Sequence, residues 1–141
     1  MSSKSFSEKH EPGAVPSPLI RHQIENHLQN GELWCASAFK IAKALDVSAI
    51  EVGKTTDLMN VRLARCQLGI FGFGPRKKIV RPVDSPVDGL EDAIRAALVE
   101  QRLPCRAAWD IARKFKVAKM TVSGVCETIG IKIGPCQLGA F

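Results

Sequence analysis

Two stretches of the chain determine its fold: Ile41-Ala-Lys-Ala-Leu-Asp-Val-Ser-Ala-Ile-Glu-Val52 and Ile111-Ala-Arg-Lys-Phe-Lys-Val-Ala-Lys-Met-Thr-Val122. In each stretch a small residue, Ala42 or Ala112, lies beside branched apolar residues. A small residue lets two helices cross closely, and the branched residues fix the crossing. Both stretches therefore predict a pair of helices joined by a short turn, at Asp46 in the first and at Lys116 in the second.

These stretches belong to an internal repeat that covers most of the chain. A shift of 70 positions lays residues 20–71 (copy one) on residues 90–141 (copy two) without a gap. Fourteen of the 52 paired positions are identical, most of them apolar, and both copies end in Cys-Gln-Leu-Gly-x-Phe. Identity at apolar positions with free variation between them predicts a shared core beneath surfaces that differ.

Apolar spacing and capping residues predict three helices in each copy. Ser17 before Pro18, the series Ser48-Ala-Ile-Glu51 and the series Asp88-Gly-Leu-Glu91 are helix starts, the last two as capping boxes. The predicted helices span residues 18–30, 34–45 and 48–58 in copy one, and 89–101, 104–115 and 119–129 in copy two.

A short strand or wing is predicted after each third helix. Residues 61–71 and 131–141 open with apolar and basic residues in alternation, as a half-buried strand does. Pairing of these two segments with each other across a pseudo-twofold axis would hide their edges. The predicted fold is mainly α, with two tandem three-helix helix-turn-helix units related by an internal pseudo-twofold. The predicted divisions are a disordered tail (1–16), repeat 1 (17–72), a basic, Pro-containing linker (73–87) and repeat 2 (88–141).

The charge balance favours an anionic partner. The chain has 141 residues and a formal net charge of +6, from 20 basic and 14 acidic residues. Four basic residues and one acidic residue fall in residues 73–87, so half of the excess lies in the linker. No apolar run is long enough to cross a membrane, and the polar start lacks the apolar stretch of a secretory signal. We therefore expect no membrane contact and a cytoplasmic protein.

The repeated series Ile41-Ala42-x-x-Leu45-Asp46-Val47-Ser48-x-x-x-Val52 resembles the core of bacterial helix-turn-helix regulators. Copy two matches it from Ile111 to Val125. The family often has glycine in the turn, where this chain has Asp46 and Lys116, and copy one has Thr55 at an apolar position. The resemblance implies that the third helix of each copy enters the major groove of DNA and presents its early residues to base edges.

Carried over position by position, the resemblance gives two sets of DNA-contacting candidates. The base-reading candidates are Ser48, Ala49, Glu51 and Lys54 in copy one, and Lys119, Thr121 and Ser123 in copy two. The backbone-contacting candidates are Arg62, Arg65, Arg76, Lys77, Lys78, Arg81 and Lys132. Glu51 and Asp57 would repel phosphate, so copy two is the better predicted reader. The alternative for all these charges is an ordinary solvated surface.

Neither a metal site nor an active site is predicted. Cys35, Cys66, Cys105 and Cys136 recur between the copies and are candidate metal ligands, but their spacing is wide, and cysteine on an apolar helix face is commonly a small buried hydrophobe. None of the three histidines recurs, and the chain has no phosphate-binding loop or nucleophile elbow. We expect no cofactor and no enzyme.

Two functions follow from these patterns. The first is a sequence-specific binder of double-stranded DNA, a transcriptional regulator, acting as a monomer with an internal pseudo-dimer or as a homodimer. The second is a protein-interaction or accessory module that docks an acidic protein partner through the same helical surfaces. The Cys-Gln-Leu-Gly-x-Phe ending also resembles segments attached to accessory proteins of molybdenum or tungsten enzymes.

Overall fold

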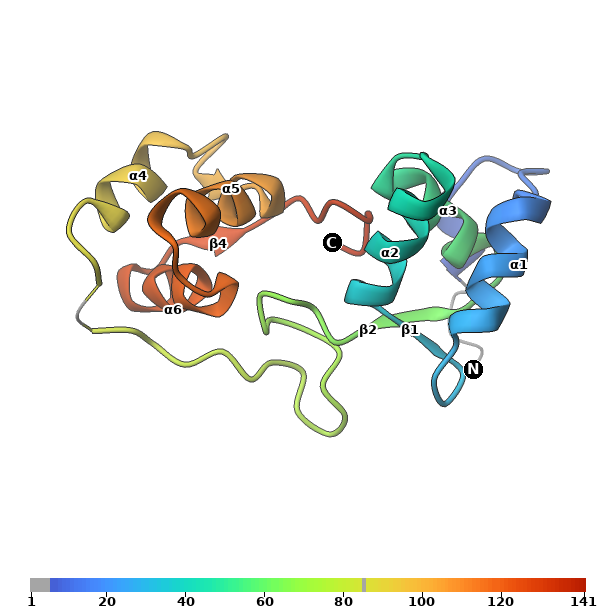
Figure 1. Cartoon of the computed structure of the whole chain (residues 1–141), viewed down its shortest axis with the longest axis horizontal. Helices are drawn as coiled ribbons and strands as arrows, with labels where there is room; N and C mark the ends of the chain where they lie inside the picture. The colour runs from blue at the N-terminus through green and yellow to red at the C-terminus, as the bar shows by residue number, and fades with distance from the viewer. Residues whose placement is uncertain (1–5, 85) are drawn as a thin grey trace. The chain divides into compact units, whose positions relative to one another are not determined.

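A computed structural model of the chain describes residues 6–84 and 86–141, and in these residues it is mainly helical (Figure 1). The chain divides into two compact units. Unit 1 contains residues 1–66 and 138–140, and unit 2 contains residues 67–137 and 141. The division after Cys66 lies earlier than the boundary at residue 72 that the sequence pattern suggested. No helix in the described residues is long and apolar enough to span a membrane.

The order of elements in unit 1 recurs in unit 2. Unit 1 contains the 3-10 helix η1 (Phe6–Lys9), α1 (Pro18–His27), β1 (Glu32–Trp34), α2 (Cys35–Leu45), α3 (Ala49–Leu58) and β2 (Arg62–Ala64). Unit 2 contains α4 (Leu90–Ala96), β3 (Arg102–Leu103), α5 (Cys105–Phe115), α6 (Lys119–Ile129) and β4 (Lys132–Ile133). From β1 onward, each element of unit 1 has its counterpart 70 residues later, and this holds for every element start.

Two of the three predicted helix caps are confirmed. The Ser17 hydroxyl accepts a hydrogen bond from the Ile20 amide at 3.5 Å, and the Ser48 hydroxyl accepts one from the Glu51 amide at 3.3 Å. The capping box predicted from Asp88 is wrong. Gly89, with φ of 85°, precedes the first residue of α4, and no side chain caps this helix. The helix is also shorter than predicted and ends at Ala96.

The predicted turns between the second and third helices lie at Asp46 and Lys116. Both residues adopt the left-handed conformation, with φ of 54° and 56°. In each unit the residue after the turn donates its amide back into the preceding helix, from Val47 to the Ala42 carbonyl and from Val117 to the Ala112 carbonyl, both at 3.0 Å. Because this bond closes the helix end, the third helix leaves at a fixed angle although neither turn contains glycine.

The strands predicted after the third helices form, but their predicted pairing is wrong. β2 pairs in parallel with β1, and β4 pairs in parallel with β3, so in the described residues each strand finds its partner within its own copy. Leu33 and Leu63 face each other in the first pair, and both are buried. The strand that leads into the second helix supplies a nearer partner than the distant copy does. Each sheet consists of two parallel strands, so neither sheet is the antiparallel wing of a winged helix.

Each unit has its own apolar core. The fully buried side chains include Ile24, Leu33, Ile41 and Val52 in unit 1, and Ile94, Leu103 and Val122 in unit 2. Six of these residues form three pairs of counterparts 70 residues apart, as the repeat predicted. A buried branched side chain contributes about 1.5–3 kcal/mol relative to an exposed one. Ala42 and Ala112 are buried too, which permits the close helix crossing.

Candidate interface on the third helices

The third helices, predicted to present exposed side chains to DNA, are the most covered helices of the two units. In α3, Val52, Gly53 and residues 55–57 are buried. In α6, all residues from Val122 to Cys126 are buried. Over these residues neither helix has a wide exposed face, because successive residues of a helix point in different directions. Segments from elsewhere in the chain provide the cover.

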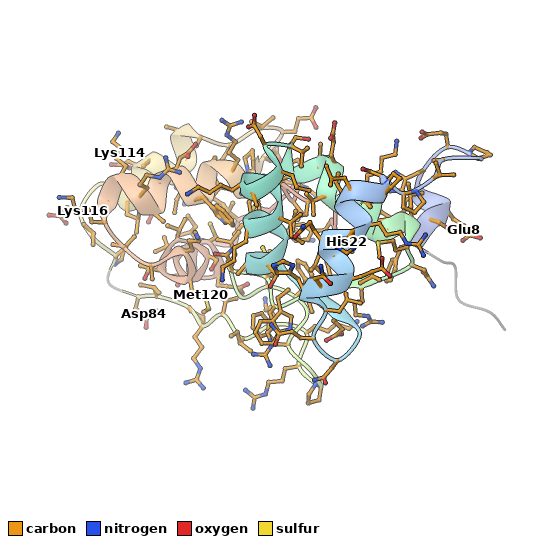
Figure 2. The ribbon with its side chains drawn as sticks, turned by 45° about the vertical axis from the view of Figure 1, so that its right-hand side comes forward. Glu8, His22, Asp84, Lys114, Lys116 and Met120 are labelled. Carbon is orange, nitrogen blue, oxygen red and sulfur yellow. The ribbon has the colours of Figure 1, made fainter. Side chains whose placement is uncertain are left out.

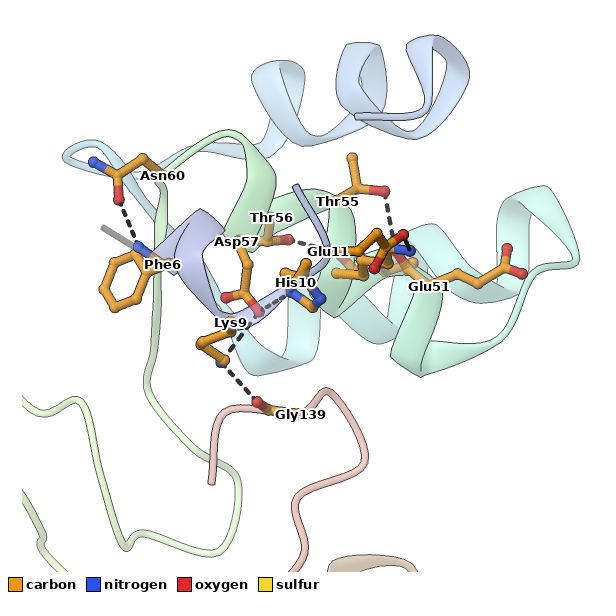
Figure 3. Close-up of polar contacts among 12 residues, drawn as sticks. Phe6, Lys9, His10, Glu11, Glu51, Thr55, Thr56, Asp57, Asn60 and Gly139 are labelled. Carbon is orange, nitrogen blue, oxygen red and sulfur yellow. Dashed lines mark hydrogen bonds and ion pairs between the residues drawn. The ribbon is translucent and has the colours of Figure 1, made fainter. Parts of the chain in front are cut away.

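In unit 1 the C-terminal segment covers α3. A Cβ atom at Gly53 would overlap the carbonyl group of Leu138, so the backbone of the segment lies directly on the backbone of the helix. The Leu138 side chain is 1% exposed. The Lys9 ammonium donates a hydrogen bond to the Gly139 carbonyl at 2.8 Å, which ties the segment to the N-terminal region (Figure 3).

The N-terminal region also covers α3. The buried carboxylate of Asp57 pairs with Lys9 at 3.1 Å and with His10 at 2.9 Å (Figure 3). Glu11 pairs with Lys54 at 3.0 Å, and the Asn60 side-chain oxygen accepts from the Phe6 amide at 3.0 Å. A backbone hydrogen bond, and then the bond from Lys54, lower the pKa of the Glu11 carboxyl.

Residues 6–16, the described part of the tail that the sequence predicted to be disordered, make defined contacts with α3. Residues 6–9 form a helical turn, and the contacts of Lys9, His10 and Glu11 hold this region on α3. The polar composition suggested disorder because the tail offers little apolar surface to bury. The buried carboxylate of Asp57 on α3 instead forms an ion pair with Lys9 of the tail. Residues 1–5 lie outside the described residues.

In unit 2 the segment that follows β2 covers α6 in the same way. The Ser123 hydroxyl donates to the Leu68 carbonyl at 2.6 Å, and the Leu68 side chain is completely buried. The Lys119 ammonium donates to the Gln67 side-chain oxygen at 2.8 Å. Further along the helix, a Cβ at Gly124 would lie 2.7 Å from the Arg81 carbonyl oxygen. Lys78 pairs with Glu127 at 2.6 Å.

The covers of the two third helices match position by position. Gly53 and Ser123 are counterparts in the repeat, and each contacts the carbonyl of the leucine in Cys-Gln-Leu-Gly, Leu138 or Leu68. Asp57 and Glu127 are also counterparts, and each pairs with a lysine of a covering segment. Protein segments thus cover part of the faces that the helix-turn-helix resemblance assigns to base edges, while Ser48 and Glu51 stay exposed and Thr121 stays half-buried.

This arrangement corrects one predicted base-reading residue and constrains three others. Ser123 was predicted to be exposed but is 1% exposed, and its hydroxyl donates to the Leu68 carbonyl. Lys119 lies half-buried over the Trp109 ring, 4.0 Å from its centroid. Ser48 caps α3, and Lys54 pairs with Glu11. Thr121 is half-buried, and among the described residues its side chain makes no hydrogen bond.

Most of the predicted backbone-contacting residues are exposed. Arg65 stacks over the Trp34 ring at 4.3 Å, and Lys78 is engaged by Glu127. The others are exposed and form no ion pair within the described part of the chain: Arg62, Arg76, Lys77, Arg81 and Lys132. Three of these five lie in the connector between the copies, where the sequence placed the largest charge excess.

Positive charge is concentrated in unit 2. This unit contains 12 of the lysines and arginines and seven of the aspartates and glutamates, a net charge of +5, whereas unit 1 has eight and seven, a net charge of +1. Besides the connector, α5 and its C-cap expose Arg106, Arg113, Lys114 and Lys116. Lys114 and Lys116 point away from the helix into solvent (Figure 2). Unit 2 is therefore the part of the chain with the stronger attraction for an anion.

The cysteines are buried. All five are buried without a disulfide, and Gln137 donates a hydrogen bond to the Cys105 sulfur at 3.4 Å. Burial, and then the nearby Glu127 carboxylate, raise the pKa of the Cys126 thiol to about 11. Among the described residues, no three His, Cys, Asp or Glu side chains gather as metal ligands would.

Two glycines carry a signal that the sequence analysis missed. Gly53 and Gly124 lie within the third helices, where glycine costs about 1 kcal/mol relative to alanine. Such a residue usually marks the close approach of another backbone. Here the approaching groups are the carbonyls of Leu138 and Arg81.

No family model, curated protein or solved structure that was compared with this chain matches it.

Proposed function

We propose that this chain binds duplex DNA, with unit 2 supplying most of the phosphate contacts. The observation that carries this proposal is the charge distribution: unit 2 holds +5 of the net charge of +6, on side chains that are largely exposed. Contacts between basic side chains and phosphates provide much of the affinity of proteins for DNA. A role in transcriptional regulation is what the helix-turn-helix resemblance adds.

The geometry of the helix pairs supports the same proposal. In both units a buried alanine, a left-handed turn residue and a short third helix follow one another, as the resemblance implies. Because the third helices are covered, we propose phosphate-directed binding as the main mode. Base reading is then restricted to the start of α6, near Thr121.

Affinity for a mixed-sequence duplex, measured as salt is raised, tests this proposal. We expect the logarithm of the binding constant to fall by about 0.9 per phosphate contact for each tenfold rise in salt. Replacing Arg76, Lys77 and Arg81 by alanine should weaken binding to all duplexes and flatten this dependence. The matched control replaces Lys40 and Lys43, exposed lysines of unit 1, and should change both quantities much less.

Two outcomes would contradict the proposal. The first is an absence of binding to duplex DNA at low salt in a chain whose helical content is intact. The second is an equal loss of affinity from the Lys40 and Lys43 control, because the charge of unit 2 would then have no special part in binding.

The second candidate, a protein-interaction module, is favoured by a different observation. The third helices already hold short chain segments, through a backbone contact at Gly53 and through the hydroxyl of Ser123. A helix face with this property suits a peptide better than a base edge. An acidic protein that competes with DNA for unit 2, or that binds where DNA does not, would favour this candidate.

The internal pseudo-twofold relation between the copies stays a prediction. It requires the two copies to move as one body, which ¹⁵N relaxation tests directly. A single rotational correlation time for both units would support the prediction. Independent tumbling of the two units would contradict it.

A further inference from the structure

The Leu-Gly step of the repeated ending lies on the third helix in the same register in both units. The Leu138 carbonyl lies on Gly53, and the Leu68 carbonyl accepts from Ser123, the counterpart of Gly53. One turn earlier, a Cβ at Gly139 would lie 2.8 Å from the Ile50 side chain, and one at Gly69 would lie 2.7 Å from the sulfur of Met120. The same contact made twice, with different helix residues, indicates a preserved binding mode.

Backbone conformation and burial explain why this step is suited to docking. Gly69 and Gly139 both have positive φ, 76° and 81°, which glycine adopts without strain. The preceding leucines are almost completely buried, so each supplies an apolar anchor. The step therefore brings one apolar anchor, one helix-facing carbonyl and one glycine to each third helix.

The origin of these segments is reciprocal. Unit 1 takes Leu138–Ala140, which end copy two, and unit 2 takes the segment from Gln67, which ends copy one. Each unit is thus completed by the ending of the other copy. Exchange of an identical element between chains requires no new contact, because the site and its occupant are already encoded in one sequence.

We propose that the α3 face of unit 1 is a docking site for the Leu-Gly ending, and that a second copy of this chain supplies residues 138–140 when the site is not filled by its own ending. The result is a dimer in which one chain completes unit 1 of another. This inference does not depend on DNA binding. Within a single chain the tether gives the internal ending an advantage, so exchange is favoured when internal docking is blocked or the chain is concentrated.

Two full-length variants separate the site from its occupant. Gly53→Ala places a methyl group against the Leu138 carbonyl and blocks the site, while its ending remains intact. Leu138→Asp removes the apolar anchor of the ending and leaves the site intact. Glu51→Ala, at an exposed position of the same helix, is the matched control for Gly53→Ala.

Mixing the two variants tests the exchange by light scattering after size-exclusion chromatography. We expect a 1:1 dimer in the mixture of Gly53→Ala and Leu138→Asp, and none when either variant is mixed with itself. The Glu51→Ala chain mixed with Gly53→Ala should remain monomeric, because its own ending fills its site. If the Leu138→Asp chain is unfolded alone, the Gly53→Ala chain should restore its helical circular dichroism.

The site itself is tested by thermal unfolding. Gly53→Ala should lower the melting temperature of the natural chain but raise it slightly in the Leu138→Asp chain, because alanine favours a helix once the ending no longer lies on residue 53. Equal effects in both backgrounds would overturn the docking site. A mixture that remains monomeric and regains no helical signal would overturn the second copy as its occupant.

Discussion

At the scale of single residues, the third-helix positions have structural uses that their chemistry alone does not reveal. Ser123 and Lys119 are residue types that read bases in DNA-binding helices, yet here one holds a backbone carbonyl and the other lies over an indole ring. Both uses depend on partners more than nine residues away in sequence. Substitutions at these two positions should therefore change the stability of the chain before they change DNA binding.

Replacement of Ser123 by alanine should destabilise the chain. The hydroxyl is buried and donates to the Leu68 carbonyl at 2.6 Å, so its removal leaves a buried acceptor unpaired. We expect a loss of about 1–3 kcal/mol in the free energy of unfolding, measured with denaturant. Thr121→Ala is the control and should change stability by less than about 0.5 kcal/mol. A change in DNA sequence preference without a loss of stability would restore Ser123 as a base reader.

The Cys126 thiol should make stability fall at high pH. Its pKa is raised from 9.0 to about 11, so the folded chain holds this proton more tightly than the unfolded chain does. The associated stability is present below pH 9 and is lost as the pH rises toward 11, by on the order of 2 kcal/mol. Cys126→Thr introduces the residue of copy one, Thr56, and should remove this part of the pH dependence. Identical pH profiles for the two chains between pH 9 and 11 would contradict the assignment.

At the scale of elements, the helices follow local sequence while their cover does not. η1 is a short 3-10 helix, yet it is held on α3 by a buried carboxylate. The equivalent carboxylate on α6 holds a lysine of the connector. An acidic residue near the end of each third helix therefore anchors whichever segment crosses it.

Substitution of Asp57 by asparagine should release the N-terminal region from α3. The neutral side chain keeps the shape but loses the ion pair with the Lys9 ammonium and the carboxylate contact with the His10 ring. We expect a loss of about 1–3 kcal/mol and faster proteolysis within residues 6–16. Glu11→Gln removes an exposed pair with Lys54 and should cost less than about 1 kcal/mol. Equal proteolysis rates in these two variants would show that Asp57 does not anchor the tail.

At the scale of the whole molecule, the sequence copies and the compact units are not the same objects. Each copy ends in a segment that belongs to the unit formed mainly by the other copy. Unit 1 therefore has no complete core cover without residues 138–140, and unit 2 has none without the segment from Gln67. The two copies should behave as interdependent parts of one structure.

Cleavage of the connector should leave the two copies associated. A specific protease site inserted after Pro75, in an exposed part of the connector, separates copy one from copy two in the covalent chain. Because residues 67–71 stay with copy one but belong to unit 2, we expect the two fragments to elute together and to separate only in denaturant. The same cleavage in the Leu138→Asp chain should weaken this association. Fragments that separate under native conditions would contradict the interdependence.

The sequence by itself determined where the helices lie, the turns at Asp46 and Lys116, the core positions shared by the copies and the repeat. These features depend on apolar spacing and capping within about a dozen residues, as at Ser48, Asp46 and Ile24. It also located the excess of charge in the connector. The failed helix cap at Asp88 shows the limit of such local rules, since Gly89 at positive φ begins that helix instead.

Only the tertiary structure decided which helix faces are exposed. The cover of α3 by residues 6–11 and 138–140, and of α6 by the segment from Gln67, joins residues 40 to 130 positions apart. Such contacts leave little trace in local composition, apart from Gly53 and Gly124 within the helices. The repeated series therefore predicted where helices lie, and long-range packing then covered the middle of both third helices.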